Sequence, residues 1–261
     1  HKALTQNRLR QDQGLQKITS RMATKHNSLA VSQLNKTPDA LWSTGKITVG
    51  TSADQMPLGP GETINTWKRE NRNYIQYAVA QPQLLDWYLG SIVTNPIQQE
   101  IDDTRFEIWS FPDHHFNLEH YQKALFSSCQ FIRDNLCEFP YKEVRLVETP
   151  YYKGDFFSFP NSICISEKEG WYADAKGLEE RAYLLQTTAS QMITLWLNRN
   201  VKIANVQGAR MLNEALPEAL ALQVVYEELG EEAVRLLLQK KSDVYNKDRY
   251  TEPNKEPALL N

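Results

Sequence analysis

Short runs of β-branched and aromatic residues in the first part of the chain give way to helical spacing in the second. From Ala40 to Val93 the runs "KITVGTSADQ", "TINTWK" and "YIQYAVA" predict strands. The intervening "RENRN" indicates a hairpin loop, and the stretch from Pro57 to Gly61 indicates a turn. The pattern predicts a β-rich module over residues 37–100. Residues 1–36 are polar, and we interpret them as a linker or peripheral helix.

A strand, a helix and further strands are predicted after this module. "RFEIWSF" and "YKEVRLVETP" are typical of strands, and Pro150 ends the second. "DFFSFPNSICISE" predicts one edge-like strand, because Pro160 interrupts it. A helix follows Asn117, a good N-cap residue. Its apolar residues form one stripe: Leu118, Tyr121, Leu125, Cys129, Ile132 and Leu136.

Helical spacing dominates from Gly177 onward. It predicts helices over 178–198, 209–229 and 231–246, followed by a loop tail over 247–261. Strands followed by segregated helices are typical of an α+β fold, with a mixed sheet and then helices. Residues 101–246 would form its main domain.

Composition narrows the classes of protein that fit this layout. The chain has 261 residues, 41% of them hydrophobic, which is enough for a substantial core. Its net charge of -3 and the lack of a long basic run argue against a nucleic-acid partner. No apolar run is long enough to span a bilayer, and no signal peptide is visible. Because the chain begins with His1 rather than Met, we expect a soluble piece of a longer protein, with His1 as a tag remnant.

The cysteines suggest ordinary buried thiols. Cys129 and Cys137 stand eight residues apart in the predicted helix, which separates them by roughly 12 Å. That distance is too long for a disulfide. With Cys164 they form an odd, irregularly spaced set, which argues against a cysteine zinc site.

Simple catalytic motifs are missing from the sequence. The segment "DHHFNLEH" holds His114, His115 and His120, but its spacing matches neither His-Glu-x-x-His nor His-x-x-Glu-His. We interpret these histidines as surface or capping residues, with a weak adventitious metal site as the alternative. There is no Gly-x-Ser-x-Gly elbow, and "GPGE" is a turn rather than a phosphate loop.

The segment "TASQMITLW" has the frame of a metal-binding helix without the metal-binding residues. Ser190 and Thr194 share one helical face, and Gln191 stands beside Ser190. Histidines at the first two positions and a glutamate at the third would create His-Glu-x-x-His, with Glu214 on the next helix as a further ligand. By periodicity alone, a buried helix with small hydroxyl residues is the plainer interpretation.

A family resemblance favours the metal-helix interpretation. "ANVQGARMLNEALPEALALQVVYEELG" resembles the segment after the zinc helix of bacterial aminopeptidase-N-like gluzincin domains, especially the subgroup associated with ABC-transporter permeases. Residues 50–82 are similar to the end of that family's β-domain. Residues 106–125 and 141–152 resemble the entry into its thermolysin-like peptidase domain. Residues 158–174 are similar to the strand that carries its Gly-x-Met-Glu-Asn element. The resemblance covers most of the chain.

The resemblance implies a role for five positions. The two zinc histidines fall on Ser190 and Thr194, the general base on Gln191, and the third ligand on Glu214. The glutamate that holds the substrate's amino group falls on Glu167, although the surrounding residues depart from the family motif. The family's transition-state tyrosine has no counterpart that can be placed in this sequence.

These replacements remove the chemistry of the implied site. Hydroxyl groups are poor zinc ligands at neutral pH, and glutamine cannot act as a general base. We therefore expect no catalytic residue, no metal and no cofactor. The hypothesis is a pseudopeptidase: an extracytoplasmic, periplasmic domain of a transporter-associated membrane protein. It would bind a peptide or protein through Glu167 and Glu214, or serve as a structural module. The transmembrane region of the same full-length protein would be a partner.

Two alternatives stay open. An active metallohydrolase with an atypical metal site would recruit His114, His115 or His120 together with Glu167 or Glu214. The two glutamates could also be simple surface or capping carboxylates.

An unrelated α+β domain would keep Glu214 apart from Ser190 and Thr194. If the site is a zinc site that lost its ion, Glu214 should instead accept a hydrogen bond from Ser190, Thr194 or Gln191, because a buried carboxylate needs a partner.

Overall fold

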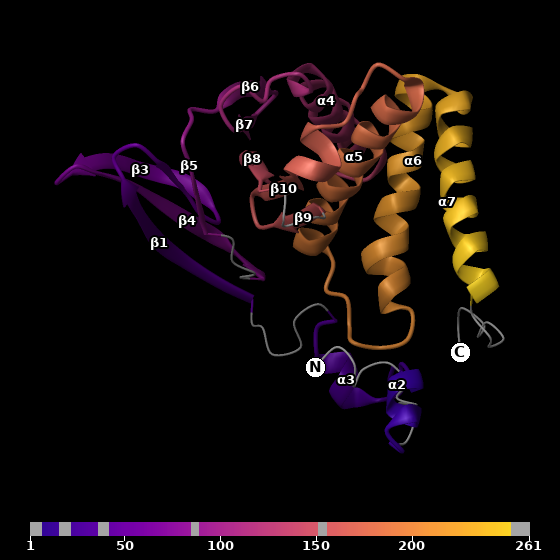
Figure 1. Ribbon diagram of the computed structural model, residues 1–261. Coiled ribbons are helices and arrows are strands. Elements are labelled where there is room, and N and C mark those ends of the chain that lie inside the picture. Colours follow the sequence, from indigo (N-terminus) through magenta and orange to yellow (C-terminus); the bar gives the residue numbers. More distant parts are fainter. Residues whose placement is uncertain (1–6, 16–21, 36–41, 85–88, 151–155, 252–261) are drawn as a thin grey trace.

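The computed structural model describes residues 7–15, 22–35, 42–84, 89–150 and 156–251. Its elements in chain order are α2 (Asn7–Asp12), α3 (Ser28–Ser32), β1 (Trp42–Ser52), β2 (Met56–Leu58), β3 (Glu62–Arg69), β4 (Arg72–Leu84), β5 (Gly90–Ile92), β6 (Ile97–Ile101), β7 (Thr104–Trp109), α4 (Leu118–Asn135), β8 (Glu143–Thr149), β9 (Phe156–Phe159), β10 (Ser162–Ser166), η2 (Glu167–Trp171), α5 (Leu178–Asn200), η3 (Met211–Ala215), α6 (Leu216–Leu229) and α7 (Glu231–Thr251). Figure 1 shows β1, β3 and β4 on one side, α6 and α7 on the other, and the remaining strands between them.

The first sheet is antiparallel, with strand order β1-β4-β3. Its β3–β4 hairpin turns at Glu70 and Asn71, which both have positive φ angles of 50° and 58°. Two positive φ angles are typical of the tight turns that match the twist of paired strands. The hairpin expected at "RENRN" is therefore confirmed.

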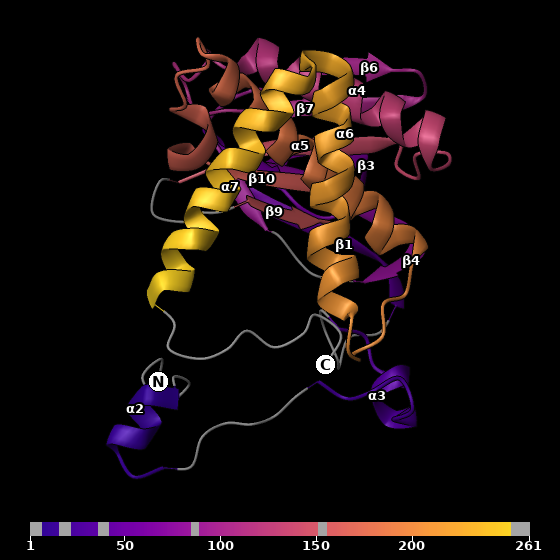
Figure 2. The same ribbon diagram turned by 90° about the vertical axis from the view of Figure 1, so that its right-hand side faces the viewer.

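The second sheet has five strands in the order β6-β7-β8-β10-β9. The central strands β7, β8 and β10 run parallel, and both edge strands are antiparallel to their neighbours. Every residue of β8 is buried, because both faces of the sheet are covered. Leu146 packs into the core shared with the helices, while Val147 packs into the core below β2 and β5. α5 packs against β9 and β10, and α6 and α7 pack against α5 (Figure 2).

The segment predicted as one edge strand around Pro160 forms two strands instead. Pro160 ends β9, because its nitrogen has no hydrogen to donate. Asn161 adopts a φ of 62° and turns the chain into β10. As predicted, β9 is an edge strand, but β10 lies inside the sheet between β8 and β9.

The α4 helix buries the predicted stripe, with Tyr121, Leu125, Cys129 and Ile132 in the core. Asn117 stands at the N-cap of α4 as predicted, but its side chain makes no capping hydrogen bond. Its amide nitrogen donates to three carbonyls at 2.9–3.1 Å. They belong to Gly170, Trp171 and Ala173. Asn117 therefore holds η2 against the start of α4.

The last helix is longer than its apolar pattern predicts. α7 continues to Thr251, so residues 247–251 are helical rather than a tail, and 252–261 lie outside the described residues. An exposed helix needs no apolar face, and the polar residues at this end include good helix formers. In the described part of the chain, no helix combines the length and apolar character needed to cross a bilayer.

One buried arginine joins the two sheets. Arg145 is 1% exposed, and it points from β8 toward the β-rich module. Its guanidinium donates to the carbonyls of Gly59 and Gly61 and to the hydroxyl of Thr63. It also forms ion pairs with Glu143 and Glu107. Its central carbon lies 4.6 Å from the ring centre of Tyr77. Burial raises the pKa of Tyr77 to about 12. Ion pairs, hydrogen bonds and a cation–π contact of this one arginine therefore connect β8 with the β-rich module.

The three thiols should differ sharply in reactivity. Cys129 and Cys164 are buried as predicted, but Cys137 is exposed. Burial raises the pKa of both buried thiols to about 12, so only about one in ten thousand is thiolate at pH 8. We expect an aromatic disulfide reagent to modify one thiol per folded chain rapidly. Cys137→Ser should remove that rapid phase, and a second rapid thiol would contradict the assignment.

Candidate functional site

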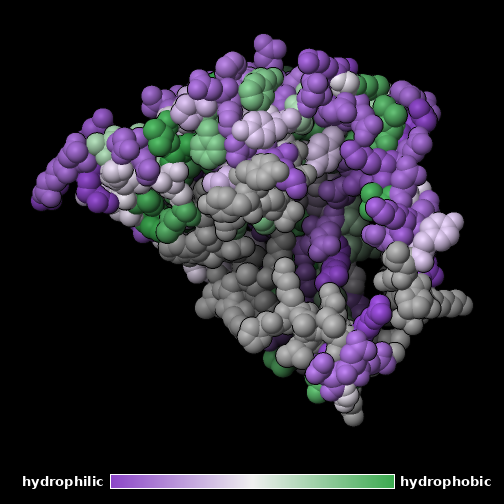
Figure 3. Space-filling view, in the orientation of Figure 1, coloured by the Kyte–Doolittle hydropathy of each residue, from purple (hydrophilic) through white to green (hydrophobic). Residues whose placement is uncertain are grey.

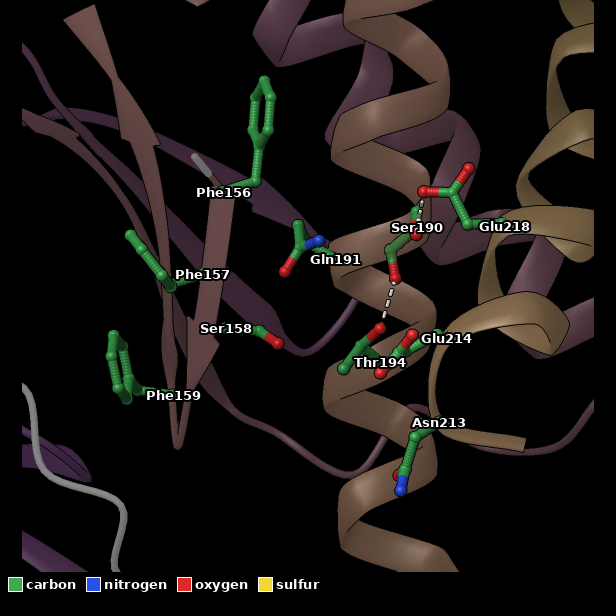
Figure 4. A pocket seen from close by; sticks show the side chains of 10 residues that line it. All are labelled: Phe156, Phe157, Ser158, Phe159, Ser190, Gln191, Thr194, Asn213, Glu214 and Glu218. Carbon is green, nitrogen blue, oxygen red and sulfur yellow. Dashed lines mark hydrogen bonds between the residues drawn. The ribbon is translucent and has the colours of Figure 1, made fainter. Parts of the chain in front are cut away.

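A cavity of about 370 Å³ lies between the edge strand β9 and helices α5 and α6. Figure 4 shows the ten side chains that line it: Phe156, Phe157, Ser158, Phe159, Ser190, Gln191, Thr194, Asn213, Glu214 and Glu218. On the face shown in Figure 3, the surface is hollowed beside the long helices, and hydrophilic residues line the hollow. The four predicted positions Ser190, Gln191, Thr194 and Glu214 thus meet in one pocket.

The α5 wall of the pocket comes from the spacing of its residues. Ser190 and Thr194 lie one turn apart on the same face, and both are largely buried. The Thr194 hydroxyl donates to the Ser190 carbonyl at 2.8 Å, as threonines within helices often do. The Ser190 hydroxyl points across the pocket to Glu218 at a long 3.5 Å (Figure 4).

The prediction that Glu214 accepts a hydrogen bond from Ser190, Thr194 or Gln191 is wrong. Glu214 is exposed, and no described residue donates a hydrogen bond to it. Glu218, one turn further along, takes that place instead. It accepts from the amide of Gln186 at 3.0 Å and from the ammonium of Lys241 at 2.7 Å, as well as from Ser190. The i,i+4 spacing of Glu214 and Glu218 was the sequence signal for this second carboxylate.

Asn213 closes the lower end of the pocket. It is 8% exposed and donates to the side-chain oxygen of Asn35 at 2.8 Å, and Asn35 in turn donates to Asn205 at 3.1 Å. Asn213 lies within the π-helical turn η3. Such turns are frequent at functional sites. No pattern in the sequence pointed to this residue.

The pocket residues do not fit a zinc ion. The Thr194 hydroxyl donates its hydrogen to a carbonyl of its own helix, and the Ser190 hydroxyl donates to Glu218. Two neutral hydroxyls and the exposed carboxylate of Glu214 supply none of the imidazole ligands that a zinc site of this kind requires. Gln191 offers an amide, which cannot take a proton from water.

Glu167 lies elsewhere. It begins η2 directly after β10 and does not line the pocket. Its carboxylate accepts a hydrogen bond from the Tyr172 hydroxyl at 2.8 Å, which raises the pKa of Tyr172. The structure therefore separates Glu167 from the other four predicted positions.

Near Glu167 lies His114, which is not the surface histidine expected. The side chain of His114 is only 18% exposed, and its Nδ1 lies 2.7 Å from Glu148. Glu148 is fully buried and also accepts the Phe111 N–H at 2.7 Å. Burial raises the pKa of Glu148, and these two hydrogen bonds act against that rise. His115 is exposed as predicted.

Comparison with known proteins reveals a likeness of fold. No protein-family model and no curated protein matches this chain. A solved structure, aminopeptidase A of Legionella pneumophila in complex with aspartic acid, superposes with a TM-score of 0.63 and 15% sequence identity over 77% of this chain. The match covers 25% of that aminopeptidase, so this chain spans about a quarter of its length. The chain therefore has an aminopeptidase-like fold of the α+β class.

Proposed function

We propose that this chain is a catalytically inactive aminopeptidase-like domain that binds a peptide or protein segment between β9 and α5. The observation that carries the proposal is the shared pocket of Ser190, Gln191, Thr194 and Glu214 beside a sheet edge. The likeness of fold to an aminopeptidase agrees with the resemblance of residues 204–230 to gluzincin domains.

Loss of catalysis follows from the residue types in the pocket. Hydrolysis of a peptide bond by this class of site needs a metal ion that activates water and a base that accepts its proton. Ser190 and Thr194 replace the implied ligands, and Gln191 replaces the implied base. Of the implied zinc ligands and base, only Glu214 remains in the pocket.

Binding remains chemically available to the same pocket. β9 is an edge strand, and among the described strands it pairs only with β10. An extended segment can add to such an edge as a further strand. Glu214 and Glu218 place negative charge on the opposite wall, and Lys241 offsets part of it at Glu218. This arrangement favours a segment that carries a positive charge.

The setting of the domain follows from the subgroup that it resembles. We place it on the extracytoplasmic side of a membrane, as part of a transporter-associated protein. The transmembrane region of the same full-length protein would then be its second partner. The resemblance of residues 204–230 supports this placement.

Peptide binding should depend on Glu214 and on the peptide's backbone. We expect fluorescence anisotropy to detect binding of extended peptides with a basic N-terminal residue. Glu214→Gln should weaken binding by about 1.5- to fivefold, the range for an exposed charge pair. Methylation of the peptide's backbone nitrogens should weaken it further, because a β-strand addition uses those N–H groups.

The matched control is Glu227→Gln, which removes the same charge from an exposed position on α6 outside the pocket. It should leave the affinity unchanged. Equal weakening by both variants would contradict binding in the pocket. Release of free amino acids from the peptides would support the active metallohydrolase instead.

A further inference from the structure

A second group of chemically active side chains lies at the carboxyl ends of the parallel strands. His114 follows β7, Glu148 stands near the end of β8, and Glu167 follows β10 directly. Because β7, β8 and β10 are neighbours and run parallel, these three ends meet at one edge of the sheet. Ligands of α/β sheets bind preferentially at this edge. None of the three residues lines the pocket described above.

The ring of His114 is held by a buried carboxylate. Glu148, whose side chain is fully buried, is fixed by the Phe111 N–H at one oxygen and contacts Nδ1 of His114 at 2.7 Å with the other. An ionised carboxylate in this position keeps the hydrogen on Nδ1 of a neutral imidazole. The lone pair then lies on Nε2. Histidines that bind metals are held in the same way, by a carboxylate on the far nitrogen.

Nε2 faces two further oxygen atoms. The Glu167 Oε1 atom lies 4.0 Å from it, and the Tyr172 hydroxyl lies 3.4 Å from it and 2.8 Å from Oε1. In a triangle with these sides, one point lies about 2.0 Å from all three atoms, which is the length of a Zn–N or Zn–O bond. At this point Nε2 and the Glu167 Oε1 atom lie on nearly opposite sides of the ion, so tetrahedral coordination needs a small shift of the side chains.

We propose that this chain binds one divalent transition-metal ion, with Zn²⁺ as the best match, between His114 and Glu167, with the Tyr172 hydroxyl as a weaker third donor. Glu148 is the positioning residue that orients the imidazole. One imidazole and oxygen donors suit zinc and its neighbours in the first transition series. This metal site is separate from the proposed peptide-binding pocket between β9 and α5 and does not depend on it.

Zinc titration of the metal-free full chain tests this site. We expect isothermal titration calorimetry to give one zinc per chain. Glu167→Gln should lower the affinity at least about tenfold by removing a ligand. Glu148→Gln should lower it about 10- to 100-fold by releasing the ring. Glu214→Gln, which removes the same charge from the peptide-binding pocket, should leave the zinc affinity unchanged.

The variants also separate this site from other zinc contacts and from the groove. Circular dichroism confirms folding, and Tyr172→Phe, at an exposed position, is the second test if Glu167→Gln does not fold. Tyr172→Phe should weaken zinc binding severalfold. Absence of zinc binding to the unchanged chain, equal affinity in Glu167→Gln, or loss of zinc in Glu214→Gln would each overturn the proposal. Peptide binding should be the same in Glu167→Gln as in the unchanged chain, so the two proposals can fail independently.

Discussion

Writing the implied zinc motif back into α5 should create a zinc site in the groove. We expect the triple variant Ser190→His, Gln191→Glu and Thr194→His to bind one additional zinc ion, at least about a thousandfold more tightly than the same pocket does without the histidines. The two imidazoles would lie one turn apart on one face, as His-Glu-x-x-His requires. Glu214 lines the same pocket and would supply the third ligand. The cavity of about 370 Å³ offers room for the larger side chains.

The measurement is zinc per chain by elemental mass spectrometry after dialysis against metal-free buffer. It is best made with Glu167→Gln in the background, so that the proposed site at His114 does not contribute. Adding Glu214→Gln to the triple variant should lower the affinity again, by about 100-fold. A folded triple variant without zinc would show that the α5 and α6 walls do not converge on one ion. Zinc retained without Glu214 would show that this carboxylate points away from it.

Removing Arg145 should have the largest effect on stability. We expect Arg145→Met to lower the free energy of unfolding by about 3 to 5 kcal/mol, the usual result of removing one partner of a buried ion pair. Glu143 is 3% exposed and would keep its charge with less compensation. Three polar groups of the β-rich module, the Gly59 and Gly61 carbonyls and the Thr63 hydroxyl, would lose their shared donor.

Urea unfolding followed by circular dichroism measures this loss. Arg235→Met is the matched control, because Arg235 forms an exposed ion pair with Glu232 on α7. We expect little change from that control. Adding Glu143→Gln to Arg145→Met should recover part of the stability, because it removes the charge left behind. An equal loss in both arginine variants would mean that Arg145 does not join the sheets.

Local pattern predicted most of the elements for definite physical reasons. The apolar stripe of α4 repeats with the period of a helix, so burial on one face identifies it. α5 is buried around most of its circumference, because the sheet and other helices cover it. The structure differs from these predictions where interactions outside the local pattern decide the conformation. Asn117 stands at the N-cap of α4, but its side chain donates to three carbonyls of a distant segment rather than to its own helix. α7 runs past its last apolar residue because an exposed helix needs none.

In the peptide-binding pocket, too, the roles of residues close in sequence could be predicted and those with distant partners could not. Ser190, Gln191 and Thr194 are neighbours on one helix, so their common face followed from spacing alone. Glu218 and Asn213 were missed, because their roles depend on partners as remote as Gln186 and Asn35. The position of Glu167 could not be inferred either, since it depends on which strand lies next to which.

The sequence by itself determined the helical and extended segments, the α+β order, and the residue types on one face of α5. Those properties depend on side chains only a few residues apart, for which the periods of helix and strand are sufficient. Only the tertiary structure decided that β9 and α6 enclose that face, and that His114, Glu148 and Glu167 meet. Glu148 lies near the end of β8, and His114 and Glu167 follow β7 and β10, so these residues meet only after the parallel strands have paired.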